Sequence, residues 1–331
     1  MATIKDIANR LGISVSAVSK GLNGASDISE ELRQAVLDTA VELGYSTKRS
    51  RKEEHRKLCI FIENMDHTTA GGFGYDIVLG FRQNAFRQKW DVDVIPVTPE
   101  FQKQDKYDIY MLRNGYCGAL FLGFALQDPW MQQLQNTTMP TVLLDNYIRK
   151  NPHVCYIGTD NNEAIDLAID HLTLLGHKKI ALLNGSPHSM VSEERHAAFR
   201  MSLENHNLEV DEDLMVYGHY VPETAQYHVP GFLKKGATAI ICGNDLIASG
   251  VYAECKRLGY DVPNDVSVIG FDDLPIASIL EPPLSTLRQE RSELGKFAYD
   301  SLNALINHIR IGRTMLRPQL VIRESTGRIH K

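Results

Sequence analysis

Short apolar runs that alternate with helical segments dominate the chain from residue 58 onward, and they constrain its fold most. The runs are Leu58–Ile62, Val92–Val97, Ala119–Leu122, Thr141–Leu144, Lys179–Asn184, Ala237–Cys242 and Val266–Phe271. Helical segments lie between them, for example Ile77–Gln88, Glu163–Leu175, Glu194–His206 and Ile247–Leu258. Continuous apolar strands joined by crossover helices predict parallel sheets covered on both faces. Because there are more strands than we expect in a single sheet, we divide them between two doubly wound α/β subdomains.

The residues before this alternation predict a separate head of three helices. Thr3 is placed to cap the first helix, with Asp6 in the capping-box position. Gly12 allows the positive φ of a tight turn, and Ser14 is placed to cap the second helix. A third helix is expected to begin after Ser29. Three helices in about 45 residues form a small domain of the helix-turn-helix kind.

The second of these helices has a surface suited to a DNA groove. Its exposed positions are small or can donate hydrogen bonds, and they are Val15, Ser16, Ala17, Ser19 and Lys20. A helix that enters a major groove about 12 Å wide needs such a surface. The alternative is a purely structural pair of helices that binds no ligand.

Charge is distributed unevenly along the chain. The net charge is −6, but residues 1–57 hold ten Lys/Arg and eight Asp/Glu. Six of those basic residues lie within 45–57, a strip that suits phosphate contact, although a solvated linker would look similar. The start of the chain is unlike a signal peptide, and no apolar run reaches about 18 residues. We therefore expect a cytoplasmic protein without a membrane segment, whose five cysteines stay reduced.

Carboxylates and amides follow nearly every predicted strand. They are Glu63-Asn64, Asp145-Asn146, Asp160-Asn161, Asn184, Asn244-Asp245 and Asp272-Asp273. Ligands of open parallel sheets bind beyond the carboxyl ends of the strands, so this set predicts a ligand site in the cleft between the two halves. Taken singly, Asp160 and Asn244 would serve equally well as helix caps. No spacing typical of a catalytic nucleophile, a metal site or a cofactor is present, and we expect neither enzyme activity nor a cofactor.

Several motifs, in order along the whole chain, resemble the LacI/GalR (lactose-repressor) family of bacterial transcription regulators. They are Ala2-Thr3-Ile4-Lys5-Asp6-Ile7-Ala8, Val15-Ser16-Ala17-Val18-Ser19-Lys20 with Asn23, Leu43-Gly44-Tyr45, Asp160-Asn161, Leu175-Gly176-His177, and Val262-Pro263 with Val266–Asp273. The resemblance implies an all-α helix-turn-helix head followed by an α/β core like that of periplasmic binding proteins. It also implies that the two halves of the core are joined by three crossings, which we place near Gly158, Arg288 and Pro318.

These boundaries define four parts of the chain. The head covers residues 1–46 and a basic linker covers 47–57. The N-terminal effector subdomain is assigned to 58–158 and 289–318, and the C-terminal subdomain to 159–288 and 319–331.

The resemblance also implies where the ligands bind. The expected DNA contacts are Thr3, Ser14, Val15, Ser16, Ser19, Lys20, Asn23, Lys48, Arg49 and Arg51. The expected effector contacts are Phe73, Tyr75, Asp145, Asp160, Arg195, Tyr220, Asn244 and Asp272. Because one basic residue stands among several acids and aromatic rings, we expect a neutral, hydroxyl-rich ligand such as a sugar. A nucleoside or nucleobase is the alternative.

The linker departs from the family pattern. Thr47 stands where family members usually carry a proline, and no large apolar residue precedes Leu58. Unstacking a base step requires an apolar wedge, so insertion of a leucine into the minor groove is not expected here. We hypothesise that this protein bends its DNA less than typical members do.

The combined expectation is a homodimeric repressor whose two heads bind the half-sites of a near-palindromic operator. An effector that binds one state better than the other would alter the spacing of the heads. The sequence leaves open whether the ligand releases DNA or is required for binding, and whether a protein co-regulator takes part. Two other classes remain possible: a solute-binding protein without a regulatory role, and an enzyme of sugar or nucleoside metabolism.

Overall fold

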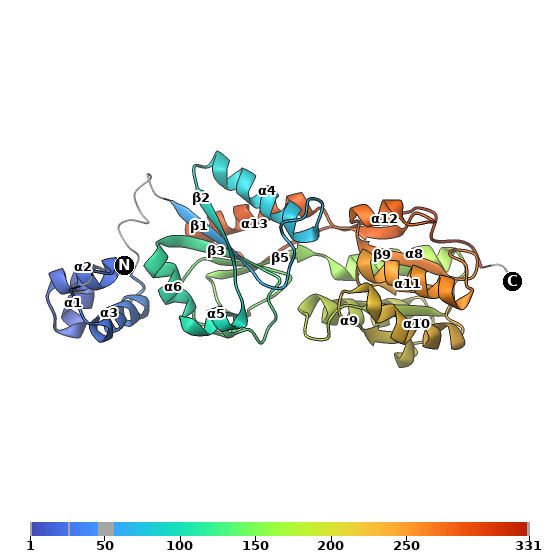
Figure 1. Cartoon of the computed structure of the whole chain (residues 1–331), viewed down its shortest axis with the longest axis horizontal. Helices are drawn as coiled ribbons and strands as arrows, with labels where there is room; N and C mark the ends of the chain where they lie inside the picture. Colours follow the sequence, from blue (N-terminus) through green and yellow to red (C-terminus); the bar gives the residue numbers. More distant parts are fainter. Residues whose placement is uncertain (1, 26, 46–55, 330–331) are drawn as a thin grey trace. The chain divides into compact units, whose positions relative to one another are not determined.

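The computed structural model describes residues 2–25, 27–45 and 56–329 and divides into two compact units (Figure 1). Unit 1 comprises Met1–Met65, Ile77–Ile157 and Gly295–Thr314. Unit 2 comprises Asp66–Asp76, Gly158–Leu294 and Met315–Lys331. The segment Asp66–Asp76 therefore belongs to unit 2, whereas the sequence analysis assigned it to the N-terminal subdomain.

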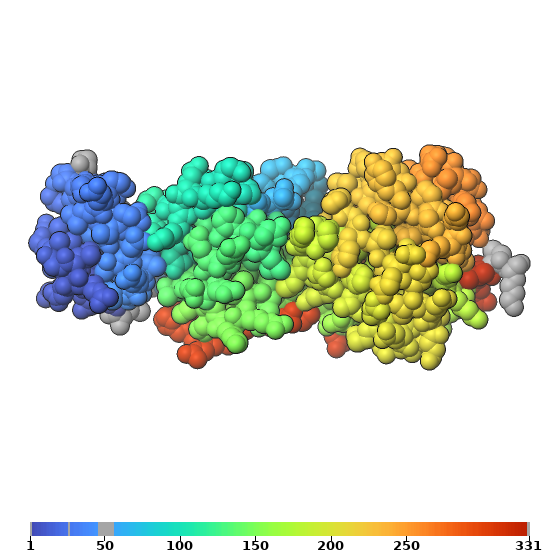
Figure 2. Space-filling model, turned by 90° about the horizontal axis from the view of Figure 1, so that it is seen from below, coloured from blue at the N-terminus to red at the C-terminus, as the bar shows by residue number. Residues whose placement is uncertain are grey.

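The head consists of three short helices, α1 (Ile4–Leu11), α2 (Val15–Asn23) and α3 (Glu30–Glu42). The helix caps are the predicted ones: Thr3 and Asp6 form a capping box, while Ser14 and Ser29 accept hydrogen bonds from the first turns of α2 and α3. Gly12 has φ +66° in the turn between α1 and α2. The helices bury Ile7, Ala8, Val18, Val36, Leu37 and Ala40 against one another. Figure 2 shows the described residues of the head, in blue, as one closely packed body.

Unit 1 contains a sheet of six strands in the order β11-β5-β4-β3-β1-β2. The strands are β1 (Lys57–Ile62), β2 (Asp91–Pro96), β3 (Tyr116–Leu122), β4 (Thr141–Leu144), β5 (Val154–Thr159) and β11 (Arg313–Leu316). The helices of this part of the chain are α4 (Phe73–Arg87), α5 (Pro99–Gln104), α6 (Tyr107–Asn114), α7 (Pro129–Gln133) and α13 (Arg291–Ile306). β1 through β5 pair in parallel, as expected for strands joined by crossover helices.

Helices cover both faces of this sheet (Figure 1). On one face Phe61 packs edge-on against Trp130 of α7, with ring centroids 4.9 Å apart, and against Tyr107 of α6. On the other face α4 and α13 pack together, and the rings of Phe81 and Tyr299 meet at 5.8 Å. The sheet is therefore buried on both sides, which explains why its strands are apolar without alternation.

Unit 2 contains a second sheet of six strands in the order β12-β10-β9-β8-β6-β7. The strands are β6 (Ile180–Asn184), β7 (Met215–Tyr217), β8 (Ala239–Cys242), β9 (Ser267–Asp272), β10 (Ser285–Arg288) and β12 (Gln319–Val321). β6 through β10 pair in parallel, and β12 is antiparallel to β10. The helices are α8 (Asn161–Leu174), α9 (Met190–Asn205), η3 (Glu212–Leu214), η4 (Pro222–Thr224), α10 (Ala225–Lys234), α11 (Asp245–Leu258) and α12 (Pro275–Ile279).

Two apolar clusters fill the faces of the second sheet. One joins α8 and α9 to Leu182, Ile241 and Phe271, and the other joins α10, α11 and α12 to Leu183 and Val268. Together the two units and the head give the predicted fold class: a helix-turn-helix head followed by two doubly wound parallel sheets. In the described part of the chain, no helix combines the length and the apolar character that crossing a membrane requires.

Candidate functional site

The exposed face of α2 carries the side chains that the sequence analysis assigned to base contacts. Val15 is 45% exposed, and Ser16 and Lys20 are exposed beside it. The buried residues Val18 and Gly21 fix the opposite face against α3. A rigid helix therefore presents one apolar, one hydroxyl and one cationic group outward.

The other predicted DNA contacts in the head are engaged in local hydrogen bonds. Thr3 Oγ1 donates to Asp6 Oδ2 at 2.8 Å, and Ser14 Oγ accepts from the Ala17 amide at 3.1 Å. Asn23 Nδ2 donates to the Ser19 carbonyl at 2.7 Å. These side chains fix the ends of the helices that carry the exposed face. Three further predicted contacts, Lys48, Arg49 and Arg51, lie outside the described residues, as does most of the linker 47–57.

Arg195 is the central polar residue at the strand ends of unit 2. It lies on α9 and is 4% exposed. Its Nε donates to Asn161 Oδ1 and its Nη1 to the Gly243 carbonyl, both at 2.8 Å. Its guanidinium carbon lies 3.6 Å from the ring centroid of Phe271 on β9. Arg195 thus joins α8, the end of β8 and the end of β9 in one network.

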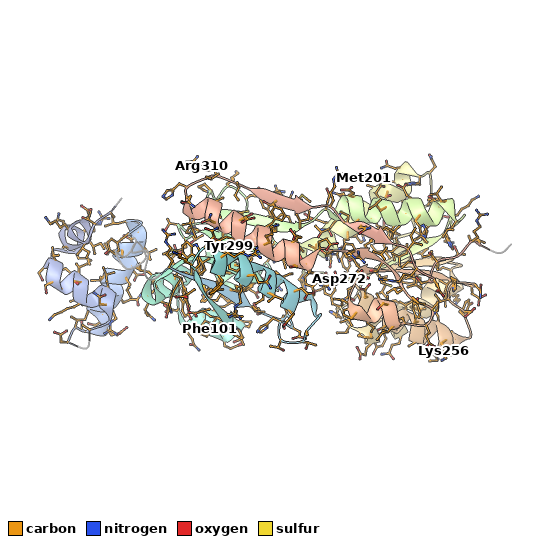
Figure 3. All side chains as sticks on the ribbon, turned by 90° about the horizontal axis from the view of Figure 1, so that it is seen from above. Phe101, Met201, Lys256, Asp272, Tyr299 and Arg310 are labelled. Atoms are coloured by element: carbon orange, nitrogen blue, oxygen red, sulfur yellow. The ribbon has the colours of Figure 1, made fainter. Side chains whose placement is uncertain are left out.

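Asp272 lies at the carboxyl end of β9 (Figure 3) and is 8% exposed. Its Oδ1 accepts a hydrogen bond from Gln289 Nε2 at 2.7 Å, and its carbonyl accepts one from Arg291 Nη1 at 2.6 Å. Burial raises the pKa of this carboxyl, while the positive charge of Arg195 opposes the increase. Among the described residues no donor binds the second carboxylate oxygen, so that oxygen can accept a further hydrogen bond.

The arginines at these strand ends have carboxylate neighbours. Arg291 Nη2 lies 2.9 Å from Asp76 Oδ2. Asp273 accepts from Arg288 and Arg323 at 2.7 and 2.6 Å. Burial would raise the pKa of Asp273, but the two arginine bonds outweigh it and lower the pKa. Arg288, Arg291 and Arg323 are therefore each paired with a carboxylate, whereas Arg195 donates to the neutral groups of Asn161 and Gly243.

Tyr220, which follows β7, contacts Asn244, which follows β8. The Tyr220 hydroxyl lies 2.8 Å from Ser192 Oγ, and Asn244 Nδ2 donates to the Tyr220 carbonyl at 3.5 Å. A Cβ on Gly185 would lie 1.9 Å from Tyr220 Cζ, so only glycine lets this ring lie against the end of β6. Asn244 also caps α11, because its Oδ1 accepts from the Ile247 amide at 2.8 Å.

The remaining predicted effector contacts are less closely joined to this network. Asp160 Oδ1 caps α8 by accepting from the Asn162 and Glu163 amides at 3.0 and 3.1 Å. Phe73 and Tyr75 lie at the beginning of α4, within the segment that belongs to unit 2. Asp145 follows β4 in unit 1, so it is the single predicted effector contact there.

Left-handed backbone recurs at the strand ends. Asn64, Asp145, Tyr220, Asp272 and Asp273 have φ of 47°, 56°, 58°, 100° and 52°. Such conformations cost about 1–3 kcal/mol each in residues other than glycine, and they gather at functional sites. Their presence after β1, β4 and β9 supports a binding role for these strand ends.

Sequence reasoning missed three members of the Arg195 network. Asn161 was noted as a strand-end amide but was not counted as a contact residue, although its Oδ1 accepts from Arg195 and its Nδ2 donates to Glu194 at 2.9 Å. Gln289 and Arg291, which bind Asp272, directly follow β10, a strand that was not among those expected from the sequence. In the part of the chain that the structure describes, no group of His, Cys, Asp and Glu is arranged to hold a metal ion.

A buried acid stands at the end of β1 in unit 1. Glu63 is 6% exposed, and its Oε2 accepts a hydrogen bond from Gln102 Nε2 at 2.9 Å. Burial, together with the neighbouring carboxyl of Asp128, raises the pKa of Glu63 from its usual 4.5 to about 8. The folded chain therefore binds a proton at neutral pH that the unfolded chain does not.

Replacement of this acid is expected to change how stability depends on pH. Because the pKa of Glu63 is higher in the folded state, its favourable contribution is lost as pH rises from about 4.5 through 8. Between pH 6 and pH 8.5, the unfolding free energy of Glu63→Gln should fall by at least about 1 kcal/mol less than that of the wild type. Urea titrations at both pH values measure this. The control is Asp91→Asn, which removes an exposed carboxyl at the start of β2; an equal effect of both variants would contradict the prediction.

Known proteins resemble this chain over its full length. Residues 3–48 match the family model of bacterial regulatory proteins, lacI family, and residues 169–326 match the periplasmic binding protein-like domain. The chain is 28% identical over 340 residues to the HTH-type transcriptional repressor PurR of Actinobacillus pleuropneumoniae serotype 3 (strain JL03), with 100% of both covered. It is 27% identical to the HTH-type transcriptional regulator MalR of Streptomyces coelicolor, with 98% of this chain and 96% of MalR covered.

Solved structures have the same architecture. The lac repressor dimer bound to operator and the anti-inducer ONPF gives a TM-score of 0.69 at 25% identity, and covers 98% of this chain and 99% of the repressor. The complex of the transcriptional regulator CelR with cellobiose gives a TM-score of 0.73 at 24% identity, covering 98% and 100%. At that identity the second likeness supports the fold alone.

Proposed function

This chain belongs to the LacI family of bacterial regulatory proteins, and we propose from that premise that it represses transcription by binding a specific operator. The observation that carries the proposal is the exposed face of α2, where Val15, Ser16 and Lys20 stand on a helix fixed by its caps and its buried face. In this proposal α2 enters the major groove of one half-site, and a second copy of the chain occupies the other half of a near-palindrome. The relatives named above are regulators rather than enzymes, so we propose no catalytic activity.

The exposed groups of α2 suit particular atoms of DNA. Lys20 suits the O6 and N7 acceptors of guanine, and Val15 suits the methyl group of thymine. Thr3, Ser14, Ser19 and Asn23 hold the helices in place and are proposed to contact the backbone of the DNA. Residues 47–57, with Lys48, Arg49 and Arg51, are proposed to contact phosphates without the apolar wedge that kinks DNA.

Removal of the Lys20 side chain is expected to change base preference at one position. Lys20→Ala should weaken operator binding by about 1–3 kcal/mol and allow any base where the wild type selects guanine. Fluorescence anisotropy on operators that differ at single positions measures this. Uniform weakening on all sequences would instead show that Lys20 contacts a phosphate. The matched control is Lys5→Ala, which removes an exposed lysine from α1.

We propose that a small neutral ligand binds at the strand ends of unit 2 and controls operator affinity. Arg195 and Asp272 would orient its hydroxyl groups, with Tyr220 and Asn244 beside them. Asp160, Phe73 and Tyr75 of unit 2 complete the proposed set of contacts. Arg288, Arg291 and Arg323 are already paired with carboxylates, which supports a sugar rather than a sugar phosphate. A nucleoside or nucleobase is the second candidate, and the full-length match to proteins named PurR is the reason to test it.

A thermal-shift screen identifies the ligand class. Purified full chain is heated with sugars, sugar phosphates, nucleosides and nucleobases in turn. A ligand at about 100 times its dissociation constant adds roughly 2.7 kcal/mol to the unfolding free energy, which raises the melting temperature measurably. A neutral sugar that stabilises the wild type but not Asp272→Asn supports the proposal. Stabilisation by phosphorylated compounds alone would contradict the neutral-ligand proposal.

A further inference from the structure

The single charged residue of α2 is already bound to an acid of the same head. Lys20 Nζ forms an ion pair with Oδ2 of Asp27, which lies between α2 and α3. Both side chains are on the surface, 46% and 59% exposed. The exposed face of α2 therefore presents a neutralised lysine when no DNA is bound.

The backbone around Asp27 is anchored by the ends of both helices. The Ala25 amide donates to the Lys20 carbonyl at 3.0 Å, and Arg33 Nη2 of α3 donates to the Ala25 carbonyl at 2.7 Å. On the other side, Ser29 caps α3 by accepting from the Leu32 amide at 3.2 Å. These bonds join Ala25 and Ser29, on either side of Asp27, to α2 and α3.

We propose that Asp27 is a specificity-determining residue of the DNA-reading face, acting through Lys20 as a built-in competitor of DNA. The inference rests on the proposed function. On non-specific DNA, Lys20 has to exchange Asp27 for a single phosphate, and the carboxylate is left in the negative field of the duplex. On the operator, a guanine offers two acceptors in fixed positions, which compensate for the lost ion pair. Asp27 therefore weakens non-specific binding more than operator binding.

The test compares the wild-type full chain with Asp27→Asn on two duplexes. One duplex is the sequence that the wild type enriches from random DNA, and the other is a scrambled duplex of equal length. Fluorescence anisotropy gives the dissociation constants at several salt concentrations. The variant should bind the scrambled duplex about threefold to fivefold more tightly, and its plot of log affinity against log salt should steepen by about 0.9. The gain on the enriched duplex should be smaller, so the ratio of the two affinities falls.

Two further variants separate this mechanism from a general effect of charge. In the Lys20→Ala background, Asp27→Asn should leave the affinity ratio unchanged, because the repulsion between its carboxylate and DNA acts alike on both duplexes and the lysine that separates them is gone. Glu31→Gln removes the same charge from the exposed first turn of α3 and should leave the affinity ratio unchanged. An equal fall in the affinity ratio with and without Lys20, or no fall when Lys20 is present, overturns the inference. A wild type that enriches no sequence would instead refute the proposed function.

Discussion

Replacing Arg195 with alanine is expected to lower the unfolding free energy by about 3–5 kcal/mol, because it leaves two buried acceptors without their donors and removes the cation that offsets the charge of Asp272. Asp272 would keep only Arg291 and Gln289 beside its buried carboxyl group, and Asn161 Oδ1 and the Gly243 carbonyl would lose their donors. The face of Phe271 would lose the cation stacked on it. Urea titration of the full chain, followed by far-UV circular dichroism, measures the loss.

An exposed arginine on the same helix provides the control. Arg200 pairs with Glu212 at the surface, and exposed pairs contribute at most about 1 kcal/mol. Adding Asp272→Asn to Arg195→Ala should restore part of the lost stability, since it removes the buried charge that Arg195 offsets. If Arg200→Ala destabilises as much as Arg195→Ala, or if Asp272→Asn restores nothing, the network at the end of β9 is not organised as described. The same Arg195 variant should also lose any ligand-induced thermal shift.

Gly295→Ala is expected to destabilise unit 1 by about 3 kcal/mol or more. A Cβ at this position of α13 would lie 2.0 Å from the Ile77 carbonyl oxygen and 2.8 Å from the Phe81 amide nitrogen. Both atoms belong to the backbone of α4, so no side-chain rotation relieves the clash, and the two helices must move apart. The midpoint of urea unfolding measures the effect.

Gly231 is the matched control, because it lies inside α10 and a Cβ added there would have no described atom within 4 Å. Alanine there should stabilise the chain by up to about 1 kcal/mol, since glycine is the poorer helix former. The two substitutions are chemically identical and are expected to have opposite signs. Similar destabilisation by both would mean that the close approach of α4 and α13 does not limit the stability of unit 1.

Local patterns were sufficient for the head. Thr3, Ser14 and Ser29 cap helices through atoms three residues away in sequence, so the residues that define the structure are neighbours in the chain. The apolar strands β1, β4, β8 and β9 were predictable for a related reason, because burial on both faces leaves a continuous apolar run.

β10 and the Arg195 network depend on contacts that are distant in sequence. Ser285 and Thr286 are polar, yet they are fully buried in β10. Ser325 Oγ accepts from the Ser285 amide at 2.8 Å, and Thr286 Oγ1 donates to Asp245 at 2.6 Å. From the sequence alone such polar residues are predicted to lie in a loop. Their burial is favourable only because they have hydrogen-bond partners, and these partners are distant in the chain. For the same reason the structural role of Asp245 could not be predicted. This strand-end acid binds the Leu274 amide and Thr286 inside unit 2.

Selection from a pool of random DNA would show whether α2 reads a base sequence. The purified full chain is mixed with random duplexes, bound DNA is recovered and amplified over several rounds, and the product is sequenced beside that of Lys20→Ala. We predict that the wild type enriches a near-palindrome with two half-sites, and that Lys20→Ala loses the preference for guanine at one position of each half-site. No enriched sequence, or identical sequences from both proteins, would contradict the assignment of α2 as the DNA-reading helix.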